Sequence, residues 1–266
     1  MMRFYVLILF LFVHLFNGQQ DYHFTYRLKA MTNLDTNKKV IEDFFLIIDR
    51  GNRSFFVGEK FSKIDSLKKS LTSKDGSATS MGFVNLADVP KTNFKFIVEK
   101  NWEDGKVKFY DNLLKYKYVY EEQPIFNWSI QNETTEIGKF NCKKAVMSAY
   151  GRDWIAWFTS DIPLNDGPYK FSGLPGLIIK ISDTQEHFTF ELIGVDKRIG
   201  SGGFTLDENI ADYRKVSKTD YLKAVRNINE NILKEVENMG IFINKEDQNA
   251  LKKRTNTPRN RLELIP

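Results

Sequence analysis

The polar residues best placed for chemistry are Arg152, Asp153 and Asp161, which stand beside two tryptophans, Trp154 and Trp157. An arginine and two carboxylates in apolar surroundings can form a partly buried ion pair. They can also line a cleft in which one carboxylate has the shifted pKa of a catalytic group. Because ion pairs that hold a loop in place are the commoner arrangement, we expect a structural role for this group.

A hydrolase is the enzymatic alternative, and it would use Asp153, Asp161 or His187. No Gly-x-Ser-x-Gly turn, P-loop or dinucleotide-binding glycine pattern accompanies these residues. Glu121 and Glu122 offer carboxylates for glycoside chemistry, but nothing in the sequence places them near the others. If the Asp153, Asp161 and His187 side chains lie more than about 10 Å apart, beyond water-bridged hydrogen-bond reach, the hydrolase hypothesis fails.

Metal and cofactor chemistry finds little support among the remaining residue types. Only His23 and His187 follow the first twenty residues, and neither has a histidine, cysteine or clustered carboxylate at ligand spacing. We therefore predict no metal site and no cofactor. Cys142 is the only cysteine, so no internal disulfide can form. It lies in the apolar-alternating stretch 140–150, which predicts a buried, unreactive thiol.

The start of the chain has the three-part layout of a secretory signal peptide. Met1-Met2-Arg3 is a short basic start, Phe4 to Phe16 is an apolar run, and the polar residues Asn17 to Gln20 follow. The run of about 13 residues is shorter than the roughly 20 that a membrane span needs. We predict that residues 1–19 are a signal peptide and that the mature protein has no membrane span. It is then exported to the periplasm, to the outer-membrane surface or out of the cell.

The remaining residues, 20–266, contain enough apolar side chains for one sizeable core. Hydrophobic residues make up 42% of the chain and include 22 phenylalanines and 11 tyrosines. Without Arg3, 38 lysines and arginines stand against 34 acidic residues, and these charges are dispersed. Dispersed charge argues against a nucleic-acid partner. With no repeat and no evident boundary, the sequence predicts a single β-rich domain.

Alternation of apolar and polar residues predicts a series of strands, beginning with Tyr22 to Ala30. Further strands are expected at 43–48, 54–57, 93–100, 106–110, 115–120, 126–130, 140–150, 153–159, 177–182 and 187–195. Their short connections leave no room for crossover helices, so neighbouring strands must be antiparallel. Residues 72–90 have the composition of a loop.

Two segments have the spacing of amphipathic helices, one near 61–71 and a C-terminal one near 218–239 with Ser217 as its N-cap. The predicted fold is therefore mainly β (α+β). It is a single antiparallel, strongly curved sheet or half-open barrel that carries a short helix and a C-terminal helix.

The stretch that follows Tyr150 is the most distinctive part of the chain. Trp154 and Trp157 fall on opposite faces of a strand, so both faces must be covered, and we expect the C-terminal helix over the outer face or an apolar cavity. Pro175 and Gly176 suit the two central positions of a type II turn, the second of which needs positive φ. We interpret the stretch as a structural corner, with a rigid binding loop as the alternative.

This stretch resembles the GLPGLI family of exported Bacteroidota proteins, which is named for the hexapeptide at Gly173 to Ile178. Gly151 to Thr159, Asp161-Ile162-Pro163 and Gly167-Pro168 match it as well. The resemblance implies export and no established activity, so it supplies no functional residues. The motif residues, for which we predict a structural role, are Arg152, Trp154, Trp157, Asp161, Pro163, Gly167, Pro168, Gly173, Leu174, Pro175, Gly176, Leu177 and Ile178.

The aromatic content and the two-sided apolar strand suggest a non-enzymatic envelope protein that binds an apolar ligand, a peptide or a protein partner. Curved sheets can hold a ligand on an apolar concave face, which is an analogy at the level of the fold alone. A further alternative is that the protein is an accessory subunit of an outer-membrane transporter, for which the predicted export is the only support. A filled concave face would count against an apolar ligand.

Overall fold

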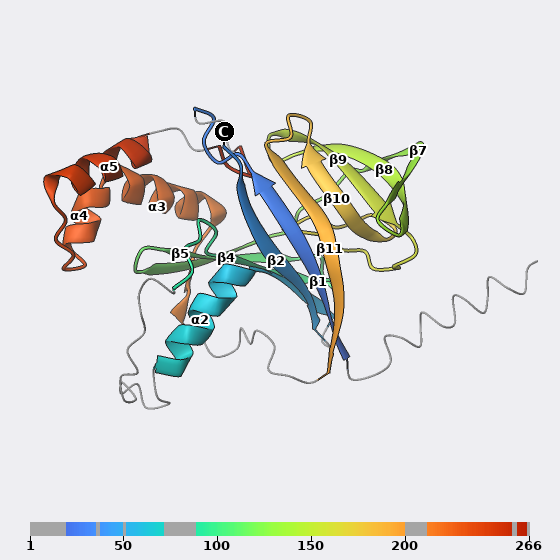
Figure 1. Cartoon of the computed structure of the whole chain (residues 1–266), viewed down its shortest axis with the longest axis horizontal. Coiled ribbons are helices and arrows are strands. Elements are labelled where there is room, and N and C mark those ends of the chain that lie inside the picture. Colours follow the sequence, from blue (N-terminus) through green and yellow to red (C-terminus); the bar gives the residue numbers. More distant parts are fainter. Residues whose placement is uncertain are drawn as a thin grey trace, which may run out of the picture.

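The computed structural model describes residues 20–35, 38–49, 52–71, 89–199, 212–256 and 260–264. The predicted signal peptide, residues 1–19, and most of the predicted loop at 72–90 lie outside this range. The described residues form one 12-stranded sheet with a few short helices, shown in Figure 1. The mainly β, antiparallel fold class is confirmed.

Each predicted strand has a counterpart, but the one expected at 126–130 begins only at Ser129 and runs to Ile137, and β12 is an addition. The strands are β1 (Gln20–Ala30), β2 (Val40–Asp49), β3 (Arg53–Gly58), β4 (Phe96–Asn101), β5 (Val107–Leu113), β6 (Tyr116–Glu122), β7 (Ser129–Ile137), β8 (Phe140–Ala149), β9 (Arg152–Thr159), β10 (Leu177–Asp183), β11 (Phe188–Ile199) and β12 (Arg214–Lys215). The helices are α2 (Glu59–Leu71), α3 (Lys218–Glu230), α4 (Ile232–Glu237) and α5 (Lys245–Asn256).

The sheet consists of two antiparallel meanders that share one seam. Strands β1 to β6 pair in chain order, and so do β7 to β11. The seam is the long antiparallel pairing of β1 with β11, in which Tyr26 lies opposite Leu192 after an irregularity at Thr25. The short β12 adds a parallel pairing beside β6, which the sequence did not predict.

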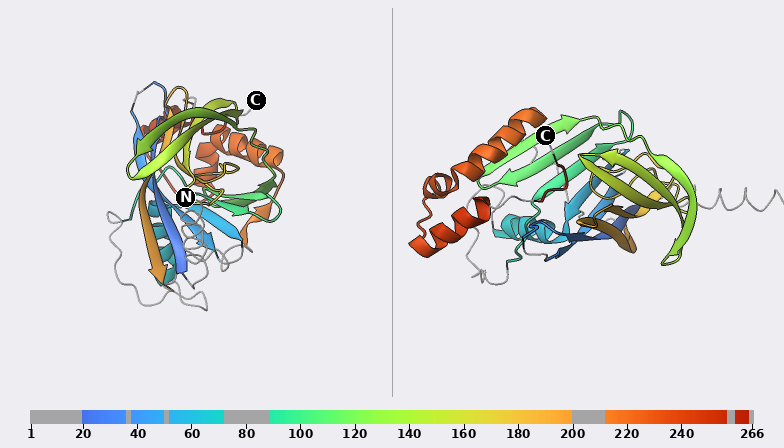
Figure 2. Two further views of the ribbon diagram at one scale, coloured as in Figure 1. Left: turned by 90° about the vertical axis from the view of Figure 1, so that its right-hand side faces the viewer. Right: turned by 90° about the horizontal axis from the view of Figure 1, so that it is seen from above.

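The sheet must curl strongly because of the connection between its two halves. Ten strand spacings of about 4.8 Å would separate β6 from β7 in a flat sheet, or roughly 50 Å. Only Gln123 to Trp128 join these strands, and an extended chain covers about 3.5 Å per residue, or roughly 25 Å in all. The two edges therefore approach each other, and Figure 2 shows the resulting curled sheet.

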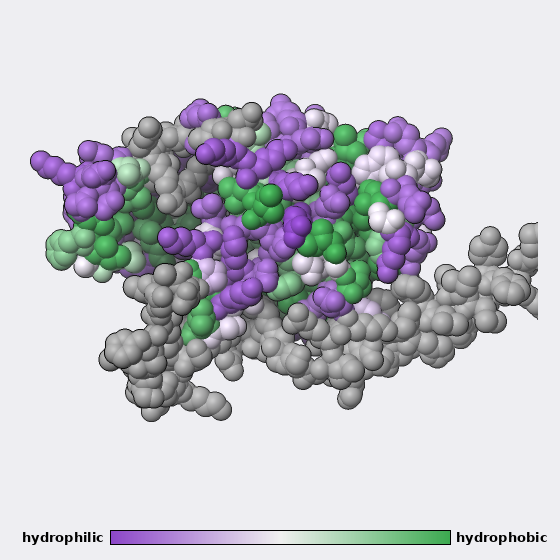
Figure 3. Space-filling model, viewed as in Figure 1, coloured by the Kyte–Doolittle hydropathy of each residue, from purple (hydrophilic) through white to green (hydrophobic). Residues whose placement is uncertain are grey.

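The core lies on the concave face, where the inward residues of successive strands are aromatic. Phe44 of β2 stacks on Phe56 of β3 with ring centroids 4.9 Å apart, and both side chains are 0% exposed. A smaller cluster forms on the convex face beneath α2, where Phe61 packs with Phe55 and Ile97. One end of the sheet therefore has a helix on its outer face and the main core on its inner face. On the molecular face shown in Figure 3, hydrophilic and hydrophobic residues are interspersed.

The predicted C-terminal helix is two helices, because the chain breaks at Asn231 between α3 and α4. Ser217 is the N-cap, as predicted, and its hydroxyl oxygen accepts a hydrogen bond from the Asp220 amide at 3.0 Å. Gly240, with φ of +73°, follows α4, and its amide donates to the Glu237 carbonyl. The polar tail also contains α5, which the sequence analysis missed.

The expectation that the C-terminal helix covers the outer face of the tryptophan strand is wrong. Helix α3 packs at the other end of the sheet order, where its Tyr221 ring lies 5.1 Å from that of Tyr120 on β6. Trp157 on the convex side of β9 is half-buried by its neighbours in the sheet. No helix between Glu59 and Asn256 that the structure describes is long and apolar enough to cross a membrane.

Candidate functional site

The connection between β9 and β10 folds back into the concave side of the sheet. We call residues Ser160 to Gly176 the inner loop. Its Asp166 is 0% exposed and forms an ion pair with Lys100 of β4, while Ser54 of β3 donates a hydrogen bond to the same carboxylate at 2.5 Å. The loop therefore connects the second meander to the first through buried charge.

Alternation along the inner loop shows that it begins as an extended segment. Asp161 and Pro163 are exposed, whereas Ile162 and Leu164 point inward and are each 7% exposed. The Leu177 amide donates to the Ile162 carbonyl at 3.1 Å, so the end of the loop returns beside its start. Asp161 therefore lies at the surface rather than in a catalytic cleft.

The hexapeptide completes this return. The amide of Ile178 donates to the Asp166 carbonyl at 3.0 Å, and the Ile178 carbonyl accepts from the hydroxyl of Tyr26 on β1 at 2.6 Å. Leu174 and Leu177 are buried in the main core.

A side chain at Gly167 would meet the Ile178 side chain at 2.7 Å, so this glycine permits close packing. Pro168 is buried, and its carbonyl accepts from the Phe171 amide at 3.1 Å.

The predicted type II turn at Pro175 and Gly176 is wrong in detail. The Gly176 amide donates to the Leu174 carbonyl at 2.8 Å, which closes a three-residue γ-turn around Pro175. Gly176 has the predicted positive φ, at +149°, and a Cβ there would lie 2.0 Å from the Thr159 carbonyl oxygen. Backbone contact, rather than turn type alone, therefore requires this glycine. Gly173 also has positive φ, at +95°, beside the Trp128 ring.

A second segment, from the far end of the described chain, enters the same region. We call residues Asn260 to Leu264 the inserted segment. Its two ends make backbone hydrogen bonds, from the Asn260 amide to the Thr32 carbonyl at 3.0 Å and from the Leu264 amide to the Tyr150 carbonyl at 2.9 Å. The segment therefore runs between the end of β1 and the β8–β9 turn.

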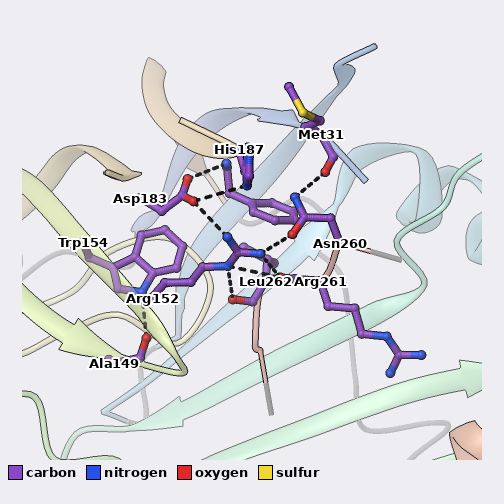
Figure 4. Close-up of polar contacts among 10 residues, drawn as sticks. Met31, Ala149, Arg152, Trp154, Asp183, His187, Asn260, Arg261 and Leu262 are labelled. Carbon is purple, nitrogen blue, oxygen red and sulfur yellow. Dashed lines mark hydrogen bonds and ion pairs between the residues drawn. The ribbon is translucent and has the colours of Figure 1, made fainter. Parts of the chain in front are cut away.

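Arg152 at the start of β9 is the main polar anchor of the inserted segment, as Figure 4 shows. Its guanidinium donates to the Asn260 side-chain oxygen at 2.5 Å and to the Arg261 carbonyl at 2.6 Å. It also pairs with the buried Asp183 of β10 at 2.9 Å. The predicted ion pair of Arg152 exists, but its partner is Asp183 and neither Asp153 nor Asp161.

Glu263 of the inserted segment enters a second buried polar cluster. Its carboxylate accepts hydrogen bonds from Lys170 at 2.5 Å and from the Tyr169 hydroxyl at 2.7 Å, both from the inner loop. Lys218 at the start of α3 pairs with the other oxygen at 2.9 Å. Both lysines also pair with Glu122 at the end of β6, so four alternating charges are held together.

The charges shift the pKa values of this cluster in a consistent direction. Burial alone would raise the pKa of Glu263, but Lys170 and Lys218 hold it below its ordinary value of 4.5. Burial would lower the pKa of Lys218, and the facing carboxylates of Glu263 and Glu122 raise it instead. The cluster is thus arranged to keep Glu263 ionised, which suits a binding contact better than proton transfer.

Two buried polar atoms at this site have no hydrogen-bond partner within the described structure. They are the hydroxyl of Tyr150, near the Glu263 end, and Nδ1 of His187, which lies 4.0 Å from the Asp183 carboxylate at the Asn260 end. Burial raises the pKa of Tyr150, with the carboxylates of Glu122 and Glu263 adding to the effect. The inserted segment therefore does not use the full bonding capacity of its surroundings.

The hydrolase residues are not brought together. Asp153 is exposed on the convex side, where it accepts a hydrogen bond from Ser148, and Asp161 follows the opposite end of β9. The strand rise places roughly 20 Å between Asp153 and Thr159. His187 lies at the Asp153 end of β9, because the Thr184 amide bonds the Asp153 carbonyl. The trio fails the distance criterion, since Asp161 cannot reach the other two.

The other predicted residues take structural positions. Trp154 is 1% exposed and its ring lies 4.7 Å from that of Phe171 in the inner loop. Cys142 is buried as predicted, and burial raises the pKa of its thiol to about 11. Within the described ranges, no three histidine, cysteine, aspartate or glutamate side chains are placed to hold a metal ion.

Most of the polar and charged residues that hold the two segments were not predicted from the sequence. They are Lys100, Asp166, Lys170, Asp183, Lys218, Asn260 and Glu263. One signal was available at Lys170, because a lysine between Tyr169 and Phe171 in an apolar stretch is often buried with a partner. The others are brought together by the fold across separations such as the 93 residues from Lys170 to Glu263, which no local pattern indicates.

Comparison with known proteins gives a family match and a fold match. The family described as "Protein of unknown function (Porph_ging)" matches residues 151–180, which contain β9 and the inner loop. A search of curated protein sequences found no match. Two structures of PNGF-II, in space groups C2 and P21, match with a TM-score of 0.52 at 17% and 18% identity.

These structural matches cover 77% of this chain and 32% of the PNGF-II chain. The chain therefore spans about a third of the length of the proteins that it resembles in structure. At this identity the likeness concerns the fold alone, and it agrees with the curled, β-rich architecture described above.

Proposed function

We propose that this chain is an exported envelope protein of the GLPGLI type that binds a polypeptide partner and performs no catalysis. The resemblance of Gly173 to Ile178 and of the flanking residues supports the family, as does the match over residues 151–180. The layout of residues 1–19 supports export. The same two features support a location in the periplasm, at the outer-membrane surface or outside the cell.

The observation that carries the proposal is the inserted segment itself. The concave side holds a short piece of polypeptide through both backbone and side-chain contacts. Trp154, which an apolar ligand would need to reach, is covered by Phe171 of the inner loop. Among the ligands considered from the sequence, a peptide therefore has direct support, and the filled concave face counts against an apolar small molecule.

Native mass spectrometry of protein purified from its own envelope tests this proposal. We expect the mass of a chain that lacks residues 1–19 and carries no lipid, and a photo-crosslinker on the outer face of α3, at Arg226, or on the inserted segment, at Arg261, is expected to capture a polypeptide. A co-extracted lipid at one copy per chain would contradict the proposal, as would a mature chain that retains its first residues.

A further inference from the structure

We propose that the contacts around Asn260 to Leu264 form a recognition site for a short partner segment with the pattern Asn-x-Leu-Glu, and that the inserted segment is its occupant within the same chain. This inference rests on the proposed function and names the chemistry of the partner. It follows from what each position of the inserted segment contacts, and from what those contacts leave unsatisfied.

The first position requires asparagine, because both the oxygen and the nitrogen of its side-chain amide make hydrogen bonds. The oxygen of Asn260 accepts from Arg152 at 2.5 Å, and its nitrogen donates to the Met31 carbonyl at 2.7 Å. An aspartate could not donate to that carbonyl, so two oxygens would face each other without a hydrogen. Figure 4 shows this amide between the two partners.

The second position makes its hydrogen bond through the backbone. Arg261 is exposed; its backbone carbonyl accepts from Arg152 at 2.6 Å, and its guanidinium acts on the Asp111 carboxylate only through its charge. Recognition of a backbone carbonyl by a guanidinium is independent of sequence. Any residue can therefore occupy this position without loss of the contact.

The third position requires an apolar side chain because it is buried, and the fourth requires a negative charge. Leu262 is 8% exposed and belongs to the main core cluster. Glu263 faces two lysines and one tyrosine hydroxyl that all point at its carboxylate. A glutamine would leave these cations with a weaker acceptor in a buried place. Leu264 is exposed and contributes its amide to the Tyr150 carbonyl.

The unsatisfied atoms argue that the present occupant is a partial fit. The Tyr150 hydroxyl and His187 Nδ1 lie at the two ends of the inserted segment and have no hydrogen-bond partner in the described structure. Buried polar groups are normally hydrogen-bonded. A partner segment with polar groups at its flanks can supply these two bonds, which gives it an advantage over the segment in the chain.

A segment tethered close to its site competes at an effective concentration on the order of millimolar. Binding of a partner is therefore best measured in full-length variants whose own segment is weakened. The double variant Leu262→Ala/Glu263→Gln removes the buried side chain and the charge. The single variant Asn260→Ala is a milder alternative that removes only the two amide contacts.

The probe is a fluorescent peptide with the sequence of residues 258–266, capped at both ends, and the readout is fluorescence anisotropy. We expect saturable binding to both variants and at least tenfold weaker binding to the wild-type protein. In the probe, replacing the asparagine by aspartate is expected to weaken binding at least tenfold. Replacing the arginine that follows it by lysine, which keeps the positive charge near Asp111, is the matched control and should change affinity less than threefold.

The outcomes separate this inference from the proposed function. Absence of binding to a variant whose near-ultraviolet circular dichroism is native would overturn the inference. Equal affinity for wild type and variants would overturn it too, because the peptide would then bind elsewhere. A polypeptide captured in the envelope at Arg226 but not at Arg261, without peptide binding, would overturn the inference alone. Bound lipid would overturn the proposed function.

Discussion

Glu263 shows how a single side chain links the fold to its candidate site. Its folded pKa is held below the ordinary value of 4.5 by Lys170 and Lys218. The unfolded chain therefore binds the proton more readily, and the carboxylate stabilises the fold fully above pH 4.5. As the pH falls below that value toward the lower folded pKa, the contribution is lost.

We predict that Glu263→Gln lowers the free energy of unfolding by about 3 kcal/mol at pH 7, because a buried ion pair loses one partner. The difference from wild type should shrink as the pH falls below 4.5, which urea titrations at several pH values can measure. A difference that stays constant down to pH 3 would contradict the assigned pKa shift. Glu133, an exposed partner of Lys144, supplies the control variant Glu133→Gln.

Gly176 gives a second prediction that concerns one residue. A valine there would combine positive φ with a Cβ 2.0 Å from the Thr159 carbonyl oxygen, so we expect a loss of about 3 kcal/mol. Gly138→Val is the control, since Gly138 has φ of +60° with no atom within 4 Å of an added Cβ. Equal losses in thermal denaturation would show that backbone strain alone matters.

For single residues, the sequence predicted backbone conformation and burial, but it did not predict which distant residues they contact. The positive φ of Gly176 and the burial of Cys142 follow from local patterns, and both are confirmed. Arg152 was expected to form its ion pair with a carboxylate of the same segment, either Asp153 or Asp161. The ion pair forms with Asp183, because strand pairing brings β10 beside β9.

The elements of the fold meet at the inserted segment, which is held mainly by Arg152. We predict that Arg152→Lys detaches this segment, since the single ammonium nitrogen of a lysine cannot take the places of the separate guanidinium nitrogens that reach Asn260, Arg261 and Asp183. Hydrogen exchange of the Asn260 and Leu264 amides should accelerate at least tenfold, because both donate only to carbonyls outside the segment.

Arg27→Lys is the matched control for this experiment. Arg27 makes a similar two-bonded contact with Asp43, but at the surface, where such pairs contribute little. Exchange of the Asn260 and Leu264 amides should stay at the wild-type rate in this variant. Equal protection in both variants would mean that the backbone bonds alone hold the segment.

Most elements could be predicted because their patterns are local. The alternation in β1 and the Ser217 cap both depend on neighbouring residues, and both appear where expected. The path of Asn260 to Leu264 depends on contacts with distant strands, and no glycine or proline marks the break at Asn231, so the sequence offered only a continuous helix and a polar tail. The packing of α3 on β6 could not be read from α3 alone.

The whole molecule is held together by buried charge that crosses the curled sheet. The inner loop belongs to the second meander, yet Asp166 and Lys170 bind Lys100 on β4 and Glu122 on β6 of the first. Separating the meanders would leave these charges without partners in apolar surroundings, at a cost of several kcal/mol per ion. We therefore expect both meanders to unfold in one transition.

Cys142 reports on this cooperativity because it is the only cysteine and lies buried on β8 in the second meander. Trp102 follows β4 in the first meander, and its indole donates to the Asp166 carboxylate at 3.1 Å. We predict that, in a single variant that keeps only Trp102, thiol labelling of Cys142 and the fluorescence change of Trp102 have the same midpoint along a urea gradient. Labelling at lower urea would mean that β7 to β11 open first, and the inner loop would then not couple the two halves.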